Sequence, residues 1–141
     1  MSDPDPIMTL AARYVALWNE PDPAERAALV RALWAPGGVQ VLVHPPQAIR
    51  EAAANLAFPE PPLEVRGHDA LEARVRRAHE MFVAPGEHVF AVAGTFPLLE
   101  RVTGVRWSMV STRTGEAVGG GLDVLALGED GRIRTDHQFI G

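Results

Sequence analysis

Hydrophobic positions in the first part of the chain recur at helical spacing. Between Ile7 and Trp18, apolar side chains return every three or four residues, so this segment predicts an amphipathic helix. A second helix is predicted from Asp22 to about Trp34. Asp22 matches a helix cap, Pro23 matches the first helical position, and a glutamate three residues after Asp22 completes a capping box.

The next segment combines a short strand, an irregular stretch and a third helix. Residues 39–44 predict a short strand that is closed by two prolines. Residues 47–66 are rich in alanine and proline and predict a loop or lid, with a helical turn or two near its start. Asp69 and Glu72 form another capping-box pattern, which predicts a helix that ends before Pro85.

The second half of the chain changes to the pattern of strands separated by turns. Helices first and antiparallel strands afterwards predict an α+β fold in which helices cover one face of a curved sheet. Several strands are apolar on both faces, so the uncovered face predicts a homodimer that forms through the sheet. The expected strands cover residues 87–97, 102–111, 117–127 and 132–140.

Two polar residues stand out in the last predicted hairpin. If Leu127 and Ile133 point inward, strict alternation also turns Asp123 and His137 inward, together with Phe139. A register that opposes Leu127 to Ile133 would place Asp123 opposite His137. An unpaired carboxylate in apolar surroundings is costly, so this pair is either a self-satisfied structural pair or a catalytic dyad.

Composition indicates one ordinary globular domain over residues 1–141. Hydrophobic residues make up 47% and charged residues 22% of the chain. No apolar run approaches the roughly 18 residues of a membrane span, which predicts no membrane association. The first residues are acidic and lack an apolar signal core, so a cytoplasmic location is expected.

The charge pattern argues against a nucleic-acid partner. The net charge is −5, and the one dense basic cluster, Arg74, Arg76 and Arg77, is interleaved with Glu72 and Glu80 at helical spacing. This spacing is typical of a solvated, ion-paired helix face.

The residue types that are missing narrow the possible chemistry. The chain has no cysteine and no lysine, which excludes thiol and Schiff-base chemistry and a Walker lysine. Its histidines show none of the usual metal-ligand spacings, so neither a metal nor a cofactor is expected. Catalysis would therefore fall to Asp, Glu, His, Tyr or Arg.

Four sequence segments resemble the SnoaL-like branch of the nuclear transport factor 2-like superfamily, and the similarity covers essentially the whole chain. The segments are Tyr14-Val-Ala-Leu-Trp-Asn-Glu20, the helix end at Leu33-Trp34, Gly67-His-Asp69, and Gly121-Leu-Asp-Val-Leu with the following Glu129-Asp-Gly-Arg-Ile133.

The resemblance implies a cone-shaped sheet wrapped around a helix, an apolar cavity, and dimers through the sheet. The superfamily includes polyketide cyclases, ketosteroid isomerase, scytalone dehydratase, limonene epoxide hydrolase and many members with no assigned reaction. The resemblance also implies that Asp123 is an inward-facing acid. Many relatives carry Asp-Pro where this chain has His44-Pro45. Ketosteroid isomerase uses a tyrosine and a protonated acid as oxyanion donors, but the resemblance does not assign that role to Tyr14.

Three functions remain open at this point. The first is a cofactor-independent isomerase, cyclase or dehydratase that acts on an enolisable carbonyl compound through Asp123 and His137. The second is a non-catalytic protein that binds a small hydrophobic molecule, and the third is a structural dimer whose cone is filled by its own side chains. The residues expected to contact a ligand are Tyr14, Trp18, Trp34, His44, Phe82, Phe90, Trp107, Met109 and Phe139.

Overall fold

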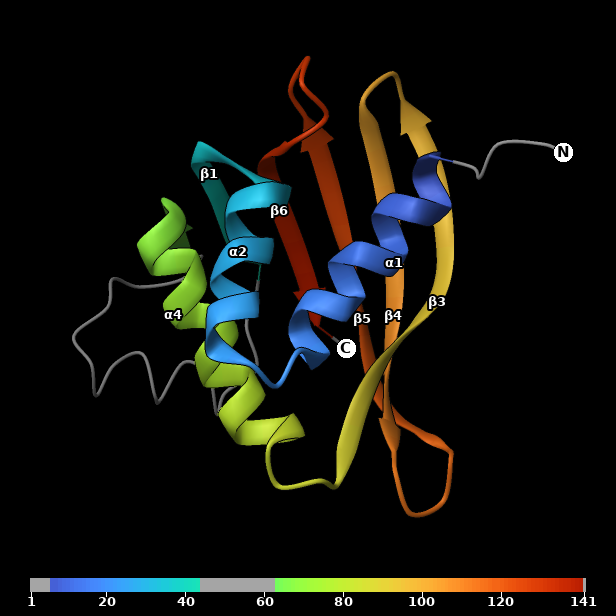
Figure 1. The fold of residues 1–141 in the computed structure, drawn as a ribbon. Helices are drawn as coiled ribbons and strands as arrows, with labels where there is room; N and C mark the ends of the chain where they lie inside the picture. The colour runs from blue at the N-terminus through green and yellow to red at the C-terminus, as the bar shows by residue number, and fades with distance from the viewer. Residues whose placement is uncertain (1–5, 44–62, 141) are drawn as a thin grey trace, which may run out of the picture.

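The described part of the chain forms one six-stranded sheet with three α-helices on a single face (Figure 1). The structure is a computed structural model, and it describes residues 6–43 and 63–140. The strand order is β2-β1-β6-β5-β4-β3, and all neighbouring strands are antiparallel except β1 and β6, which are parallel. The strands are β1 (Trp34–Val43), β2 (Leu63–Arg66), β3 (His88–Leu99), β4 (Val102–Ser111), β5 (Ala117–Leu127) and β6 (Ile133–Ile140).

The first helix, α1 (Pro6–Asn19), confirms the helical spacing in the sequence. Its buried positions recur at three and four and include Tyr14 and Trp18, which face the sheet. Asn19 fixes the end of the helix to β3, because its side-chain amide donates to the Phe90 carbonyl at 2.7 Å and its Oδ1 accepts from the Phe90 N–H at 2.8 Å. None of the helices in the described ranges is long and apolar enough to cross a membrane.

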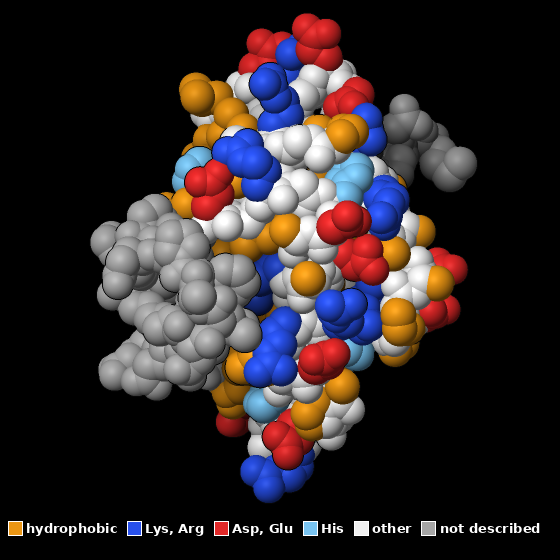
Figure 2. All heavy atoms as spheres, turned by 90° about the vertical axis from the view of Figure 1, so that its left-hand side faces the viewer, with side chains coloured by type: hydrophobic (Ala, Val, Ile, Leu, Met, Phe, Trp, Pro, Cys, Tyr) orange, Lys and Arg blue, Asp and Glu red, His pale blue; other side chains and the backbone are white. Residues whose placement is uncertain are grey.

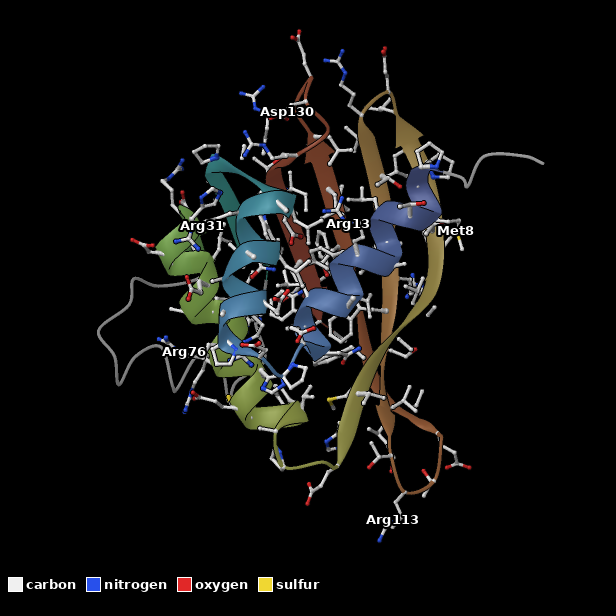
Figure 3. The ribbon with its side chains drawn as sticks, viewed as in Figure 1. Met8, Arg13, Arg31, Arg76, Arg113 and Asp130 are labelled. Atoms are coloured by element: carbon white, nitrogen blue, oxygen red, sulfur yellow. The ribbon has the colours of Figure 1, made fainter. Side chains whose placement is uncertain are left out.

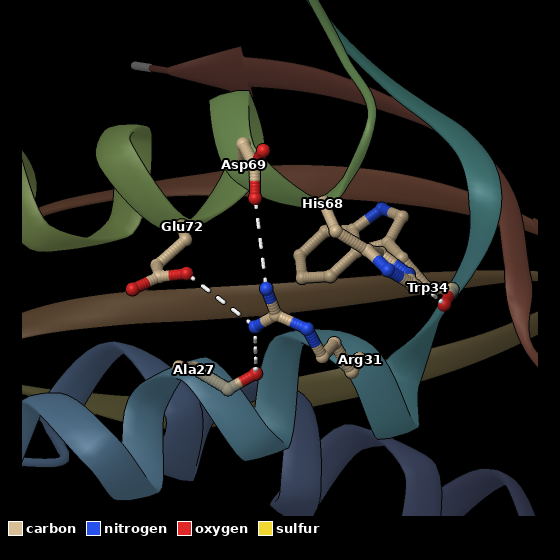
Figure 4. A network of polar contacts seen from close by, with 6 residues as sticks. All are labelled: Ala27, Arg31, Trp34, His68, Asp69 and Glu72. Carbon is tan, nitrogen blue, oxygen red and sulfur yellow. Dashed lines mark hydrogen bonds and ion pairs between the residues drawn. The ribbon is translucent and has the colours of Figure 1, made fainter.

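The second helix, α2 (Pro23–Leu33), begins as the sequence predicted. Asp22 is the cap, and its carboxylate accepts from the Ala24 N–H at 2.9 Å. Near the end of α2, Arg31 reaches across to the third helix, α4 (His68–Ala78), and contacts Asp69 at 3.5 Å and Glu72 at 3.4 Å (Figure 4).

The predicted capping box of the third helix is wrong. The cap is Gly67, whose φ of 88° favours glycine, and no side chain caps the helix. Asp69 lies inside the first turn, where it and Glu72 serve as partners of Arg31 instead. After α4 the chain continues as the π-helix η1 (His79–Val83).

The stretch 47–66 was predicted as a loop or lid, and its last residues form the edge strand β2 instead. This strand pairs antiparallel with β1, where Gln40 lies opposite Val65. Residues 44–62, which include His44 and the predicted helical turn, lie outside the described residues.

Strand β6 contains a bulge that the sequence pattern did not indicate. Leu127 lies opposite Ile133 and Ala126 lies opposite Thr135, so Arg134 is an extra residue with no partner on β5. Because side chains alternate along a strand, one extra residue moves all later side chains to the other face of the sheet.

The predicted pairing of Asp123 with His137 is therefore wrong, and so is the inward orientation of Phe139. Asp123 lies opposite Gln138. Asp136 and Gln138 are buried towards the helices, whereas His137 and Phe139 are exposed on the outer face. Asp123 itself is fully buried, which confirms that it points inward.

The outer face of the sheet is apolar, as the sequence pattern predicted. Phe96 and Leu122 both lie over Gly104, and Leu122 is opposite Phe139. Of the arginines labelled in Figure 3, Arg13, Arg76 and Arg113 are exposed without an ion pair to another described residue, whereas Arg31 bridges α2 and α4. The exposed large hydrophobic residues of the strands are Val89, Val92, Phe96, Leu98, Leu99, Val118 and Phe139, of which Val92 lies opposite Trp107 on the helix-covered face.

Candidate functional site

A buried polar cluster lies between α1 and the sheet. It is centred on Tyr14 of α1, whose hydroxyl oxygen is 2.7 Å from Asp123 Oδ2 on β5 and 2.6 Å from Asp136 Oδ2 on β6. Tyr14 is 1% exposed and both aspartates are 0% exposed. Two carboxyl groups thus share one hydroxyl away from water, an arrangement that is costly unless their charge is reduced.

Asp123 is surrounded by hydrogen-bond donors. The indole N–H of Trp107 donates to its Oδ1 at 2.7 Å, and the Gln138 amide donates at 3.2 and 3.3 Å. An ionised carboxylate can only accept hydrogen bonds, which fits this set of partners. These donors therefore stabilise a negative charge on Asp123.

Asp136 carries the proton of the pair. Burial raises the pKa of Asp136 well above the usual value of a carboxyl group, and the charge of Asp123 together with a hydrogen bond to it raises that pKa further. Gln40 on β1 donates to Asp136 Oδ2 at 3.1 Å. Burial and the two carboxyls likewise raise the pKa of Tyr14 well above its usual value, so Tyr14 remains a neutral phenol.

Arg74 of α4 belongs to this cluster and not to the solvated helix face on which the sequence placed it. Its Nη2 donates to Gln138 Oε1 at 3.0 Å, and its guanidinium lies 5.3 Å from the centre of the Trp18 ring. Burial lowers the pKa of Arg74, while the nearby Asp123 and Tyr14 act in the opposite direction. By binding Oε1, Arg74 turns the amide nitrogen of Gln138 towards Asp123.

The other basic residues of α4 are solvent-exposed, as predicted. Arg76 and Arg77 are exposed, and Arg77 lies 3.8 Å from Glu80. Acidic and basic side chains are interspersed on the side of the molecule that Figure 2 presents, without a continuous basic surface.

Several buried polar atoms around Tyr14 have no hydrogen-bond partner among the described residues. Two are donors, the indole N–H groups of Trp18 and Trp34, and two are acceptors, Gln40 Oε1 and Asp136 Oδ1. Both indole rings pack against the Tyr14 ring, with centroids 6.0 and 5.8 Å apart. Because buried polar groups are nearly always paired, these atoms could bind a small polar molecule.

The aromatic residues predicted to contact a ligand mostly surround this cluster. Tyr14, Trp18 and Trp34 have been described above. The Phe90 ring makes edge contacts with Phe82 and with Trp107, at centroid distances of 6.4 and 5.5 Å. Met109 follows Trp107 on the same face of β4 by strand alternation. Ligand contact by these residues remains a prediction, Phe139 points to the other face, and His44 lies outside the described residues.

Sequence reasoning missed Asp136, Gln40 and Gln138. The bulge concealed the two residues on β6, since strict alternation placed them outside. Gln40 did leave a signal, because it is the one polar residue in the otherwise apolar strand segment 39–43. The histidines of the described ranges take no part in the cluster. His68 contacts the Trp34 carbonyl at 2.8 Å (Figure 4), and His79, which follows α4, is buried.

Metal-ligating residues do not converge in the described ranges. No group of three or more His, Asp or Glu side chains there could hold a metal ion. The fold and the cluster together define a class of small α+β proteins in which a curved sheet and helices enclose polar side chains.

Comparison with known proteins identifies that class more closely. No protein-family model matches the sequence, and no curated protein is significantly similar to it. Among solved structures, a candidate isomerase of the SnoaL-like family from Agrobacterium tumefaciens is similar over 96% of this chain and 97% of its own, with 27% identity and a TM-score of 0.74. This likeness confirms the resemblance to the SnoaL-like branch of the nuclear transport factor 2-like superfamily.

Two more distant structures share the fold. A SnoaL-like protein of unknown function from Burkholderia thailandensis has 16% identity and a TM-score of 0.68, and covers 100% of this chain and 99% of its own. A candidate SnoaL-like polyketide cyclase from Jannaschia sp. has 14% identity and a TM-score of 0.61, and covers 99% of this chain and 91% of its own.

Proposed function

We propose that this protein catalyses cofactor-independent proton transfer on a small hydrophobic carbonyl compound. The observation that carries the proposal is the Tyr14 hydroxyl placed between two fully buried carboxyl groups, Asp123 and Asp136. Environments that separate the protonation states of two neighbouring acids are typical of acid–base sites. The His137 imidazole has no part in this proposal.

The pair holds one proton and one negative charge, so it can accept a proton from a substrate and later return one. Asp136 Oδ1 has no partner among the described residues and is the atom we assign to this exchange. A C–H bond next to a carbonyl group breaks, its proton passes to Asp136 Oδ1, and its electrons form an enolate. The proton that Asp136 already holds passes from Oδ2 to the Tyr14 hydroxyl oxygen, and the Tyr14 proton passes to Asp123 Oδ2, so the pair becomes neutral. The unpaired indole N–H groups of Trp18 and Trp34 could then donate to the enolate oxygen.

The test uses 2-tetralone, a small apolar ketone with exchangeable α-protons. In D₂O, NMR should record faster loss of these protons with the wild-type protein than with Asp136→Asn, by about 100-fold or more, the usual range for a general acid–base group. Asp130→Asn is the matched control, because Asp130 lies in the exposed β5–β6 turn (Figure 3). Equal exchange rates with wild type, Asp136→Asn and buffer, repeated with cyclohexanone, would refute the proposal.

A second candidate function is structural, and the burial of the cluster favours it. The Tyr14 hydroxyl and both carboxyls are screened from solvent, and the helix–sheet interior around them is packed with Leu17, Trp34 and other apolar side chains. In that case Asp136→Asn should change only stability. A crystal soaked with 2-tetralone would distinguish this case from a non-catalytic binder, because only the binder would hold the ketone beside Tyr14.

We also propose that two copies associate through the outer face of the sheet. Phe96, Leu122 and Phe139 form an apolar surface there that this chain's helices do not cover. Exposed apolar surfaces of this kind are typical of protein interfaces.

A further inference from the structure

A cleft of about 440 Å³ lies on the outer face of the sheet, over β2, β1 and β6. Val39 and Val41 of β1 form its floor, and Arg66, Arg134 and His137 are among the residues that line it. Its volume falls within the range of about 300 to 1,000 Å³ that is usual for small-molecule sites. It opens on the opposite side of the sheet from the buried carboxyl pair, so it is independent of the proposed proton transfer. It lies towards the β2 edge of the outer face, whereas Phe96 and Leu122 of the proposed dimer surface lie towards the β3 edge.

The bulge in β6 creates the polar side of this cleft. Arg134 is the extra residue of the bulge, and both it and Thr135 line the cleft. The same shift of register brings His137 to this face. No hydrogen bond or ion pair joins the side chain of Arg134 or His137 to another described residue. The stem of Arg134 passes over Gly128, where the β5–β6 turn begins, and its guanidinium keeps its donors for a ligand.

The charges of the cleft favour an anion. Arg66 is already paired with Glu64 on the same strand, so these two charges cancel. Arg134 then leaves a local positive charge, although the whole chain carries a net charge of −5. A guanidinium group forms two parallel hydrogen bonds with a carboxylate, and the valine floor can contact an apolar body.

We propose that this cleft binds a small organic carboxylate, with the carboxylate group on Arg134 and His137 and its apolar part on Val39 and Val41. The ligand class follows from the guanidinium of Arg134, which has no ion-pair partner among the described residues, and from the apolar side chains of Val39 and Val41 beside it. A strongly hydrated inorganic anion would leave that floor without a contact, and a neutral apolar molecule would leave Arg134 unpaired.

The experiment measures binding of naphthalene-2-carboxylate by isothermal titration calorimetry, with the uncharged naphthalene-2-carboxamide and inorganic phosphate as comparison probes. Wild type should bind the carboxylate more tightly than either. Arg134→Gln should weaken its binding by about tenfold or more, as expected for loss of a charge-assisted hydrogen-bonded pair. Arg113→Gln should bind like wild type, because Arg113 lies in the exposed β4–β5 turn away from the cleft (Figure 3).

Three results would overturn the proposal. They are equal affinity for the carboxylate and the carboxamide, unchanged affinity in Arg134→Gln, and no binding at millimolar carboxylate. Asp136→Asn serves as a further control, and it should leave this affinity unchanged. If Asp136→Asn weakens binding while Arg134→Gln does not, the probe occupies the interior, which contradicts the cleft and leaves the proton-transfer proposal standing.

Discussion

As pH rises, the free energy of unfolding of the wild-type protein should fall relative to that of Asp136→Asn. Burial raises the folded-state pKa of Asp136 well above its unfolded value, so the folded protein keeps a proton that the unfolded chain releases above about pH 4. The stabilising contribution of this carboxyl is therefore complete below that pH. It decreases as pH rises, until the folded-state pKa has been passed.

The size of the effect follows from the single proton involved. A difference of one bound proton changes the free energy of unfolding by about 1.4 kcal/mol per pH unit, over the pH range in which the folded protein keeps the proton. Asparagine has no such proton, and its amide can replace the acid O–H as a donor, so the substitution should cost only about 1 kcal/mol near pH 4. Other groups, such as His79, whose pKa is lowered by burial and by Arg26, are present in both proteins and cancel.

The assay is urea unfolding followed by tryptophan fluorescence at pH 5, 6 and 7 and constant ionic strength. Wild type should lose stability relative to Asp136→Asn as pH rises. Asp123→Asn should reduce the slope at the upper end of this range, because it removes a charge that helps to raise the pKa of Asp136. Asp130→Asn should keep the wild-type slope, since hydrogen bonds from Arg132 lower the pKa of Asp130, which is ionised throughout this range. Parallel curves for wild type and Asp136→Asn would refute the protonation assignment.

Three further outcomes test other contacts. Trp107→Phe removes the N–H that donates to Asp123 and should lower the free energy of unfolding by about 1.5 to 3 kcal/mol. A change below about 0.5 kcal/mol would show that this hydrogen bond contributes little to stability. Asn19→Ala should cost about 1 to 3 kcal/mol through its two lost contacts with the Phe90 backbone, whereas Asn19→Asp should retain one of them. Sedimentation should give a dimer of the 15.2 kDa chain that Phe139→Asp converts to monomer, and a wild-type monomer at micromolar concentration would exclude the dimer.

Much of the fold could be predicted from the sequence, because periodicity is a local property. The three-to-four spacing around Tyr14 and Trp18 gave α1, Asp22 gave the start of α2, and alternation with intervening turns gave the last four strands. The isolated carboxylate in an apolar strand also indicated correctly that Asp123 is buried. The SnoaL-like resemblance, carried by short segments spread over the chain, agreed with the structural comparison.

The edge strand β2 and the partners of α4 could not be predicted from the sequence pattern. β2 is only four residues long, too short for alternation to be distinguished from an irregular stretch. Asp69 and Glu72 fit a capping box in the sequence, but the position of Arg31 on the neighbouring helix gave them another partner. Arg74 likewise shares its spacing with two exposed arginines, and only helix packing turned it towards Trp18.

The sequence by itself determined the elements, the α+β class and the inward direction of Asp123. Tertiary structure decided which groups meet Asp123, because one extra residue at Arg134 turned Asp136 inward and His137 outward. A bulge depends on how two strands pair, so no property of β6 alone reveals it. Packing of α1 against the sheet brought Tyr14, which lies 109 and 122 residues away in sequence, within hydrogen-bond distance of the two carboxyls.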